Sequence, residues 1–134
     1  MAIKIAYIMR GISGSGKTTL ARILAGSWGN VHSADDYHMC DGRYVFDRSR
    51  LKEYHDRCFA DFCESLRSEV PVVVCDNVNC LRGHFARYIE VAEEAGYLVA
   101  VVAIPHPPLE VAVRRNVHQV PWADISEMLA KWEA

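Results

Sequence analysis

A glycine-rich segment near the amino terminus has the residue types and spacing that bind phosphate groups. Residues 11–18 have the sequence GISGSGKT, which matches the pattern G-x-x-x-x-G-K-[ST]. Glycines allow successive backbone N–H groups to point at phosphate oxygens, and the helix that follows adds its free N-terminal donors. Lys17 would reach the β- and γ-phosphates, and the Thr18 hydroxyl would ligate Mg²⁺. We therefore predict that ATP and Mg²⁺ bind through Gly11, Ile12, Ser13, Gly14, Ser15, Gly16, Lys17, Thr18 and Thr19.

A pair of carboxylates follows the short apolar run 31–33. Asp35 and Asp36 stand where the acceptor of a phosphoryl group could approach the loop. A carboxylate there can orient a hydroxyl and take its proton, and Asp35 is the candidate general base, with Asp36 on the acceptor side. The alternative is that one of the two only caps the next segment.

A second carboxylate follows the run 70–75, which is rich in valine. Asp76 has the position of an acid that holds the Mg²⁺ shell or a neighbouring arginine, and Asn77 and Asn79 could assist it. A simple turn formed by Asp and Asn after a strand is the alternative.

Two adjacent arginines, Arg114 and Arg115, end a short helical segment and precede a turn at 117–121 that could act as a hinge. Arginines on a closing lid can fork onto phosphate oxygens and neutralise the charge of the transition state. We predict a catalytic role for both and nucleotide contact for Arg115. Two solvated surface arginines are the alternative.

Basic and aromatic residues are mixed in the segment after Asp35. Such a mixture could grip a nucleic-acid backbone and stack a base, although a solvated helix face over core aromatics fits equally well. The formal net charge of −2 provides no global field for a polyanion, so nucleic-acid contact would depend on this local cluster. The cluster comprises Arg43, Arg48, Arg50, Lys52 and Arg57 with Tyr37, Tyr44 and Phe46.

The hydrophobic pattern alternates between strand-length runs and helical periods. We expect strands at 3–9, 31–33, 70–75 and 97–104, helices at 17–27, 48–69, 81–95, 109–116 and 123–132, and an irregular stretch at 39–47. Gly96 should end the helix before it. This alternation predicts an α/β fold with a parallel sheet of about four strands, whose carboxyl ends carry the polar motifs, in one domain over 1–134.

Composition excludes several other classes of site. Five cysteines without a C-x-x-C pair, and no secretory leader, indicate reduced thiols in a cytoplasmic protein. The six histidines lack metal-ligand spacing with the cysteines, so we expect no zinc site. No apolar run is long enough to cross a bilayer, and the sequence does not indicate an oligomeric state.

With these motifs in place, the chain resembles the kinase domain of phage-type 5′-polynucleotide kinase and its small stand-alone AAA-like ATPase relatives. The matching stretches are RGISGSGKTTLAR, SADDYH, DGRYVFD, VVVCDNVNC and RRNVHQVPWADISEMLAKWE. The resemblance implies a three-layer, adenylate-kinase-like P-loop kinase fold with a C-terminal helical lid at about 109–134. It also implies Asp35 as general base, Lys17 and Thr18 at the phosphates and Mg²⁺, and Arg114 and Arg115 on the lid.

The sequence departs from the phage pattern on the acceptor side. His38 stands where that kinase has an arginine, Val78 replaces a threonine, and Gln119 replaces a lid glycine or arginine. His38, Arg43 and Arg48 are the other acceptor-side candidates. No phosphatase half follows Ala134, so we expect a kinase activity alone. The leading prediction is phosphorylation of a nucleic-acid hydroxyl, at a 5′ end or on a hydroxymethylated DNA base. A small-molecule or nucleoside kinase and a regulatory ATP-binding module are the alternatives.

Overall fold

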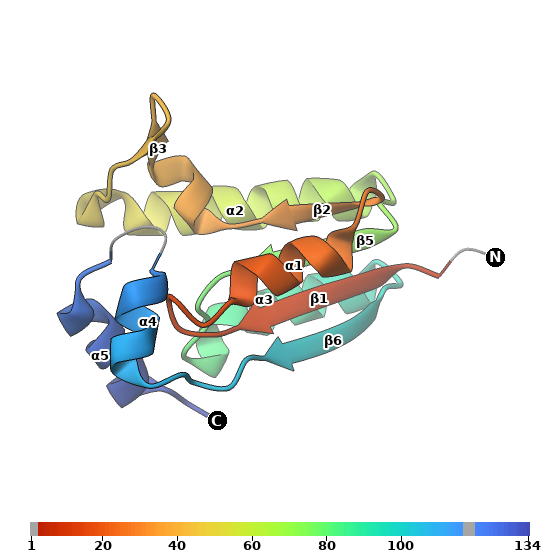
Figure 1. The fold of residues 1–134 in the computed structure, drawn as a ribbon. Coiled ribbons are helices and arrows are strands. Elements are labelled where there is room, and N and C mark those ends of the chain that lie inside the picture. The colour runs from red at the N-terminus through yellow and green to blue at the C-terminus, as the bar shows by residue number, and fades with distance from the viewer. Residues whose placement is uncertain (1–2, 117–119) are drawn as a thin grey trace.

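The computed structural model describes residues 3–116 and 120–134, and its centre is a four-stranded parallel sheet (Figure 1). The strand order is β2-β5-β1-β6. Because every neighbouring pair is parallel, β1, β2 and β5 all end at the same edge of the sheet. The expected parallel sheet is confirmed. The strands are β1 (Ile5–Arg10), β2 (Gly29–His32), β5 (Val72–Asp76) and β6 (Leu98–Ala103).

Helices cover both faces of this sheet, as the alternating pattern predicts. Successive strand residues point to opposite faces. Met9 and Val74 pack with α1 (Lys17–Ala25) on one side, whereas Ile8 and Val73 pack with α2 (Leu51–Arg67) and α3 (Arg82–Glu94) on the other. The two remaining helices, α4 (Leu109–Arg115) and α5 (Trp122–Lys131), lie beyond the carboxyl ends of the strands. The three-layer expectation is therefore confirmed.

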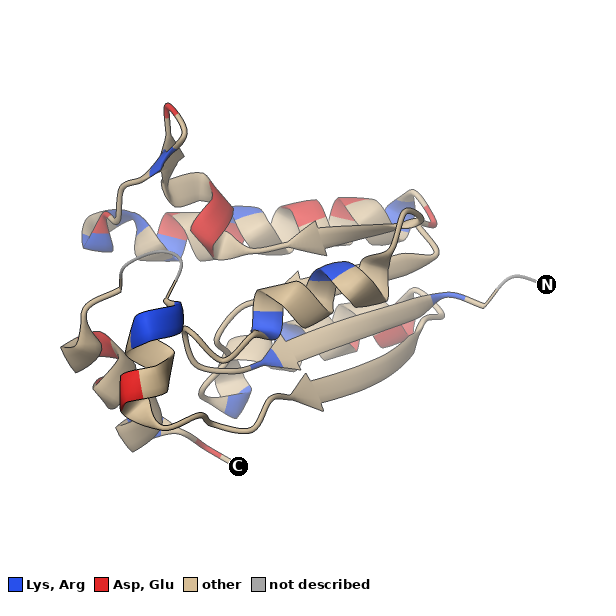
Figure 2. Cartoon of the chain, in the orientation of Figure 1, with Lys and Arg blue, Asp and Glu red and all other residues tan. Residues whose placement is uncertain are grey.

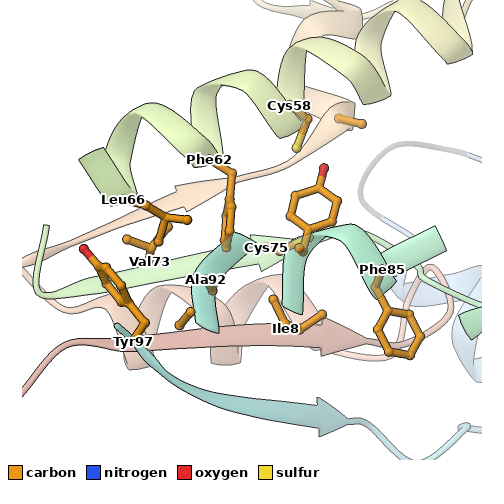
Figure 3. Close-up of a cluster of buried hydrophobic side chains, with 12 residues drawn as sticks. Ile8, Cys58, Phe62, Leu66, Val73, Cys75, Phe85, Ala92 and Tyr97 are labelled. Carbon is orange, nitrogen blue, oxygen red and sulfur yellow. The ribbon is translucent and has the colours of Figure 1, made fainter. Parts of the chain in front are cut away.

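The largest of the three hydrophobic clusters in the described residues lies between the sheet and the α2–α3 layer (Figure 3). Phe62 of α2 and Tyr88 of α3 meet edge to face with ring centroids 4.9 Å apart. Both rings are almost fully buried. Because α2 and α3 are held here by large buried side chains, their first turns are fixed beside the edge where the polar motifs gather.

A short hairpin lies where the sequence pattern predicts no regular element. The stretch expected to be irregular contains a hairpin of β3 (Met39–Cys40) and β4 (Arg43–Tyr44). Its turn residues, Asp41 and Gly42, both have positive φ, 49° and 79°. An Asp-Gly pair is a strong signal for such a turn, but two-residue strands are too short to show alternation.

The expected helix at 48–69 is divided. Asp47 accepts from the Ser49 backbone N at 3.0 Å, and this bond starts a 3₁₀ turn, η2 (Arg48–Arg50), before α2 begins. Glu69, with φ 57°, lies beyond the end of α2. Gly96, with φ 84°, follows α3 as predicted.

Strand β2 begins at Gly29, two residues before the predicted start. A Cβ at Gly29 would lie 2.6 Å from the Val72 carbonyl oxygen, so only glycine allows the close approach to β5. No helix among the described residues is long and apolar enough to span a membrane.

Candidate active site

The phosphate-loop sequence connects the end of β1 to the start of α1, as the motif predicts. Gly14 and Gly16 have φ of 81° and 91°, a conformation that other residues rarely adopt. Gly16 is the N-cap of α1 and supplies no side-chain cap, so the first N–H groups of the helix are left for another acceptor. A Cβ at Gly16 would meet nothing within 4 Å, which shows that space is open beside the loop. This arrangement suits an anion at the helix N-terminus.

Lys17, Thr18 and Asp76 form a compact polar cluster between the loop and the end of β5. Lys17 Nζ lies 2.7 Å from Asp76 Oδ1, and Thr18 Oγ1 donates to Asp76 Oδ2 at 2.9 Å. The Lys17 and Asp76 side chains are only 9% and 2% exposed. The structure therefore brings together three residues that the sequence assigns to the phosphates and the metal.

Ser15 gives an independent indication that the loop fits a phosphate group. Its Oγ is buried and has no hydrogen-bond partner among the described residues. A buried hydroxyl without a partner is costly, and a phosphate oxygen would accept from it. The oxygen donors of Thr18 and Asp76 are the ligand type that Mg²⁺ takes alongside phosphate oxygens. No cluster of three or more His, Cys, Asp or Glu suited to a metal occurs in the described part of the chain. The donor set present thus fits Mg²⁺ shared with a nucleotide.

Asp35 lies in the 3₁₀ turn η1 (Ala34–His38), directly after β2. The Ser33 side chain accepts from Asp35 N at 3.3 Å, and Asn77 Oδ1 accepts from Ala34 N at 2.9 Å. Because Asn77 follows Asp76, the bond from Ala34 fixes the turn that carries Asp35 against the end of β5. Tyr44 donates its hydroxyl to Asp35 Oδ1 at 3.2 Å.

The two asparagines suggested as assistants of Asp76 hold loops. Asn77 makes the bond to the η1 turn, and Asn79 Nδ2 donates to the Met9 carbonyl at 2.8 Å. Asn79 also has a positive φ of 53°. Both side chains are buried and line the cleft described next, so their role is to fix the loop after β5.

A cleft of about 780 Å³ opens beside Asp35 and is the candidate site for an acceptor. Its walls come from η1 and the hairpin, the first turns of α2 and α3, the loop after β5, and α5. Ser13 connects it to the phosphate loop. Residues that line it include Asp35, Tyr44, Phe46, Arg48, Lys52, His55, His84, Arg87, Asp124 and Lys131.

Charges in this cleft are paired within the protein. Arg48 lies 3.6 Å from Asp124, Lys52 2.9 Å from Asp56, Arg87 3.3 Å from Asp56, and Lys131 2.6 Å from Glu127. Basic and acidic segments likewise alternate along α2 (Figure 2). Three of the five cations in the basic cluster expected from the sequence, Arg48, Arg50 and Lys52, lie in ion pairs, and only Arg48 and Lys52 of the five line the cleft.

Three of the predicted acceptor-side residues do not line the cleft. His38 is 4% exposed, and its Nδ1 accepts from Asp47 N at 3.2 Å, so it supports the hairpin from beneath. The placement of His38 among acceptor contacts was therefore wrong, because three aromatic rings surround the imidazole. Asp36 and Arg43 are exposed beside the cleft.

Helix α4, in the segment expected to form the lid, packs against the phosphate loop. Ile12, Ala112 and Ile125 form a buried cluster, and a Cβ at Gly14 would lie 2.0 Å from the Ala112 carbonyl oxygen. Arg114 and Arg115 are exposed in the last turn of α4 and do not line the cleft. The proposed hinge, with Gln119, lies largely outside the described residues.

The far end of α5 is anchored to the sheet through Arg10. This buried guanidinium donates to the carbonyls of Asn79, at 2.8 Å, and Cys80, at 3.1 Å. It also stacks between Phe85 and Trp132, 4.7 and 4.6 Å from their ring centroids. Helix α5 is thus a wall of the cleft that is held in place by Arg10.

Sequence reasoning missed several residues of the cleft, among them Asp124, and it missed the role of Tyr44. Asp124 was not singled out because its partner Arg48 is distant in the chain. Tyr44 was treated only as one of several aromatics, although the Asp-Gly turn before it could have predicted the hairpin that carries it.

The loop, the strand-end carboxylates and the three-layer sheet define a P-loop kinase-type fold. A family model described as an AAA domain matches residues 7–130, so the chain belongs to this family. The similarity to small AAA-like relatives that the sequence suggested is thereby confirmed.

Known proteins that the chain resembles differ in their chemistry. Rat 2′,3′-cyclic-nucleotide 3′-phosphodiesterase is 32% identical over 102 residues, which cover 74% of this chain and 23% of that protein. The chain thus spans about a quarter of the length of this curated relative. A chain of the Pnkp1/Rnl/Hen1 RNA repair complex superimposes with a TM-score of 0.72 at 18% identity, covering 98% of this chain and 44% of that one. The Mycobacterium tuberculosis APS kinase CysC, in complex with AMPPNP and APS, gives a TM-score of 0.60 at 19% identity, covering 85% and 69%. These structural matches establish the shared fold.

Proposed function

We propose that this chain is an ATP-dependent phosphotransferase that moves the γ-phosphoryl group to a hydroxyl, with a nucleic acid as the acceptor. The observation that carries the proposal is the buried Lys17–Asp76–Thr18 cluster, which lies beside a carboxylate in an open cleft. Support for ATP comes from the fold shared with a kinase described with AMPPNP. Support for a nucleic-acid acceptor comes from the fold shared with a chain of an RNA repair complex.

On the donor side, Lys17 exchanges its ion pair with Asp76 for the β- and γ-phosphates. The N-terminal amides of α1 and the Ser15 hydroxyl then bind phosphate oxygens of ATP. The folded loop already directs these donors at the phosphate site. Thr18 and Asp76 would hold Mg²⁺ together with the phosphates, and the ion would supply charge neutralisation. Arg114 and Arg115 approach from α4 and stabilise the charge that spreads over the γ-phosphoryl oxygens.

On the acceptor side, Asp35 orients the hydroxyl and accepts its proton as the new oxygen–phosphorus bond forms. The bond between the γ-phosphorus and the β–γ bridging oxygen breaks, and ADP leaves with that electron pair. The Asn77 bond, which ties the Asp35 turn to the strand that carries Asp76, supports this role.

A small-molecule or nucleoside kinase is the second candidate, and the ion pairs of the cleft favour it. All four Lys and Arg side chains among the described lining residues lie within 4 Å of a carboxylate. A long polyanion would have to displace these carboxylates, whereas a neutral polyol would not.

A panel of acceptors distinguishes these functions. The protein is incubated with γ-labelled ATP and Mg²⁺ and with 5′-hydroxyl DNA, 5′-hydroxyl RNA, hydroxymethyl-pyrimidine DNA, or free nucleosides, and Lys17→Met serves as the inactive control. Label in an oligonucleotide supports the proposal, and label in nucleosides alone supports the second candidate. Bound ATP without transfer to any acceptor would contradict both and indicate a regulatory ATP-binding module.

A further inference from the structure

Tyr44, at the end of the hairpin, reaches the carboxylate proposed as the base. Its hydroxyl donates to Asp35 Oδ1 at 3.2 Å, and both side chains line the cleft. Burial, followed by the nearby Asp35 charge, raises the pKa of Tyr44 above its ordinary value. The phenol therefore keeps its proton at neutral pH and acts as a hydrogen-bond donor.

The hairpin is built so that Tyr44 has a fixed position. Tyr44 pairs with Met39 across the two strands, and its ring lies 5.6 Å from the buried His38 ring. The backbone of His38 accepts from Val45 N at 2.8 Å, while its Nδ1 accepts from Asp47 N. These two bonds fix the residues that follow Tyr44 in the chain.

We propose that Tyr44 is a positioning residue whose hydroxyl fixes the Asp35 carboxylate in the orientation that receives the proton of the acceptor. This inference rests on the proposed phosphotransferase function. Tyr44 keeps its own proton throughout, and the proton of the acceptor goes to Asp35 as ADP leaves. Without the hydroxyl, the carboxylate rotates about its terminal torsion, and productive orientations become less frequent.

The variant Tyr44→Phe keeps the ring and removes the hydrogen bond. With γ-labelled ATP and a short 5′-hydroxyl DNA oligonucleotide, kcat should fall about tenfold while KM for ATP stays within about twofold. The acid limb of the kcat–pH profile should change in this variant, because the hydroxyl no longer donates to the proposed base. A merely structural role of Tyr44 would lower Tm and leave this limb in place.

Two further variants serve as controls. Tyr97→Phe also removes a hydroxyl donor, to the Val70 carbonyl at 2.7 Å, but it lies outside the cleft and should change neither kcat nor the profile. His55 is another titratable side chain in the cleft, and Asp36 lies next to Asp35 on η1. If His55→Asn or Asp36→Asn moved the limb as far as Tyr44→Phe does, the limb would not report on the Tyr44 bond, and the inference would be rejected.

A second measurement needs no acceptor and separates the two possible failures. In protein with ¹³C at tyrosine Cζ, Tyr44 should ionise at lower pH in Asp35→Asn than in the wild type, because the neighbouring negative charge has gone. An unchanged Tyr44 titration overturns the inference whether or not any acceptor is phosphorylated. Wild-type transfer with an unaltered rate and profile in Tyr44→Phe overturns it too. Absence of transfer to every acceptor, with the titration shifted, rejects the proposed function and leaves the Tyr44–Asp35 contact established.

Discussion

The buried ion pair between Lys17 and Asp76 stabilises the folded protein when no nucleotide is bound. Lys17, which the proposed mechanism assigns to ATP binding, therefore also contributes to stability. Lys17→Met removes one partner and leaves the Asp76 carboxylate, 2% exposed, without its cation. Breaking a buried pair in this way costs about 3–5 kcal/mol. Asp76 keeps the hydrogen bond from Thr18, so we expect the lower end, about 3 kcal/mol. In a domain of this size, that loss lowers Tm by about 10 °C.

The assay is thermal unfolding followed by circular dichroism in the absence of nucleotide. The double variant Lys17→Met with Asp76→Asn should recover most of the lost stability, since no unpaired charge remains. Lys52→Met removes a cation from an exposed pair with Asp56 and should leave Tm nearly unchanged. A Tm of Lys17→Met close to that of the wild type, or a double variant no more stable than the single one, would refute this reasoning.

Three further variants test the loop, the lid and the cleft. Gly14→Ala places a Cβ 2.0 Å from a carbonyl oxygen of α4 at a φ of 81°. It should therefore lower Tm and weaken ATP binding in calorimetry. In the control Gly83→Ala the new Cβ would meet nothing within 4 Å, so this variant should do neither. Arg115→Ala should reduce the single-turnover transfer rate more than it weakens ATP binding, and equal losses would indicate a binding role only. Asp124→Asn frees Arg48 from its exposed ion pair, and should tighten the binding of phosphate-bearing acceptors about two- to fivefold at low salt. An equal gain for uncharged nucleosides would exclude this electrostatic explanation.

The phosphate loop and its supporting elements could be predicted from the sequence because their signals are local. A β-branched run, a glycine-rich loop and helical spacing follow one another, and the structure places Lys17 and Thr18, at the start of α1, in contact with Asp76. The parallel order of the strands brings together the segments that follow them, so the position of Asp35 near the site could also be inferred.

The walls of the cleft could not be predicted because they depend on contacts between distant segments. The Arg48–Asp124 pair joins the segment before α2 to α5, and no local pattern shows that these charges neutralise each other. The two-residue strands that position Tyr44 are too short for a periodic signal. His38 was assigned to the acceptor side because it stands where the phage kinase has an arginine. That comparison gave no indication that aromatic rings bury the imidazole.

The most direct test of the account measures donor binding and phosphoryl transfer separately in Asp35→Asn. If Asp35 is the base, calorimetry gives an ATP affinity within about twofold of the wild type, while single-turnover formation of the phosphorylated acceptor slows at least about 100-fold. Transfer at the wild-type rate in this variant would show that the proton goes elsewhere and that the carboxylate beside the cleft has no part in the chemistry.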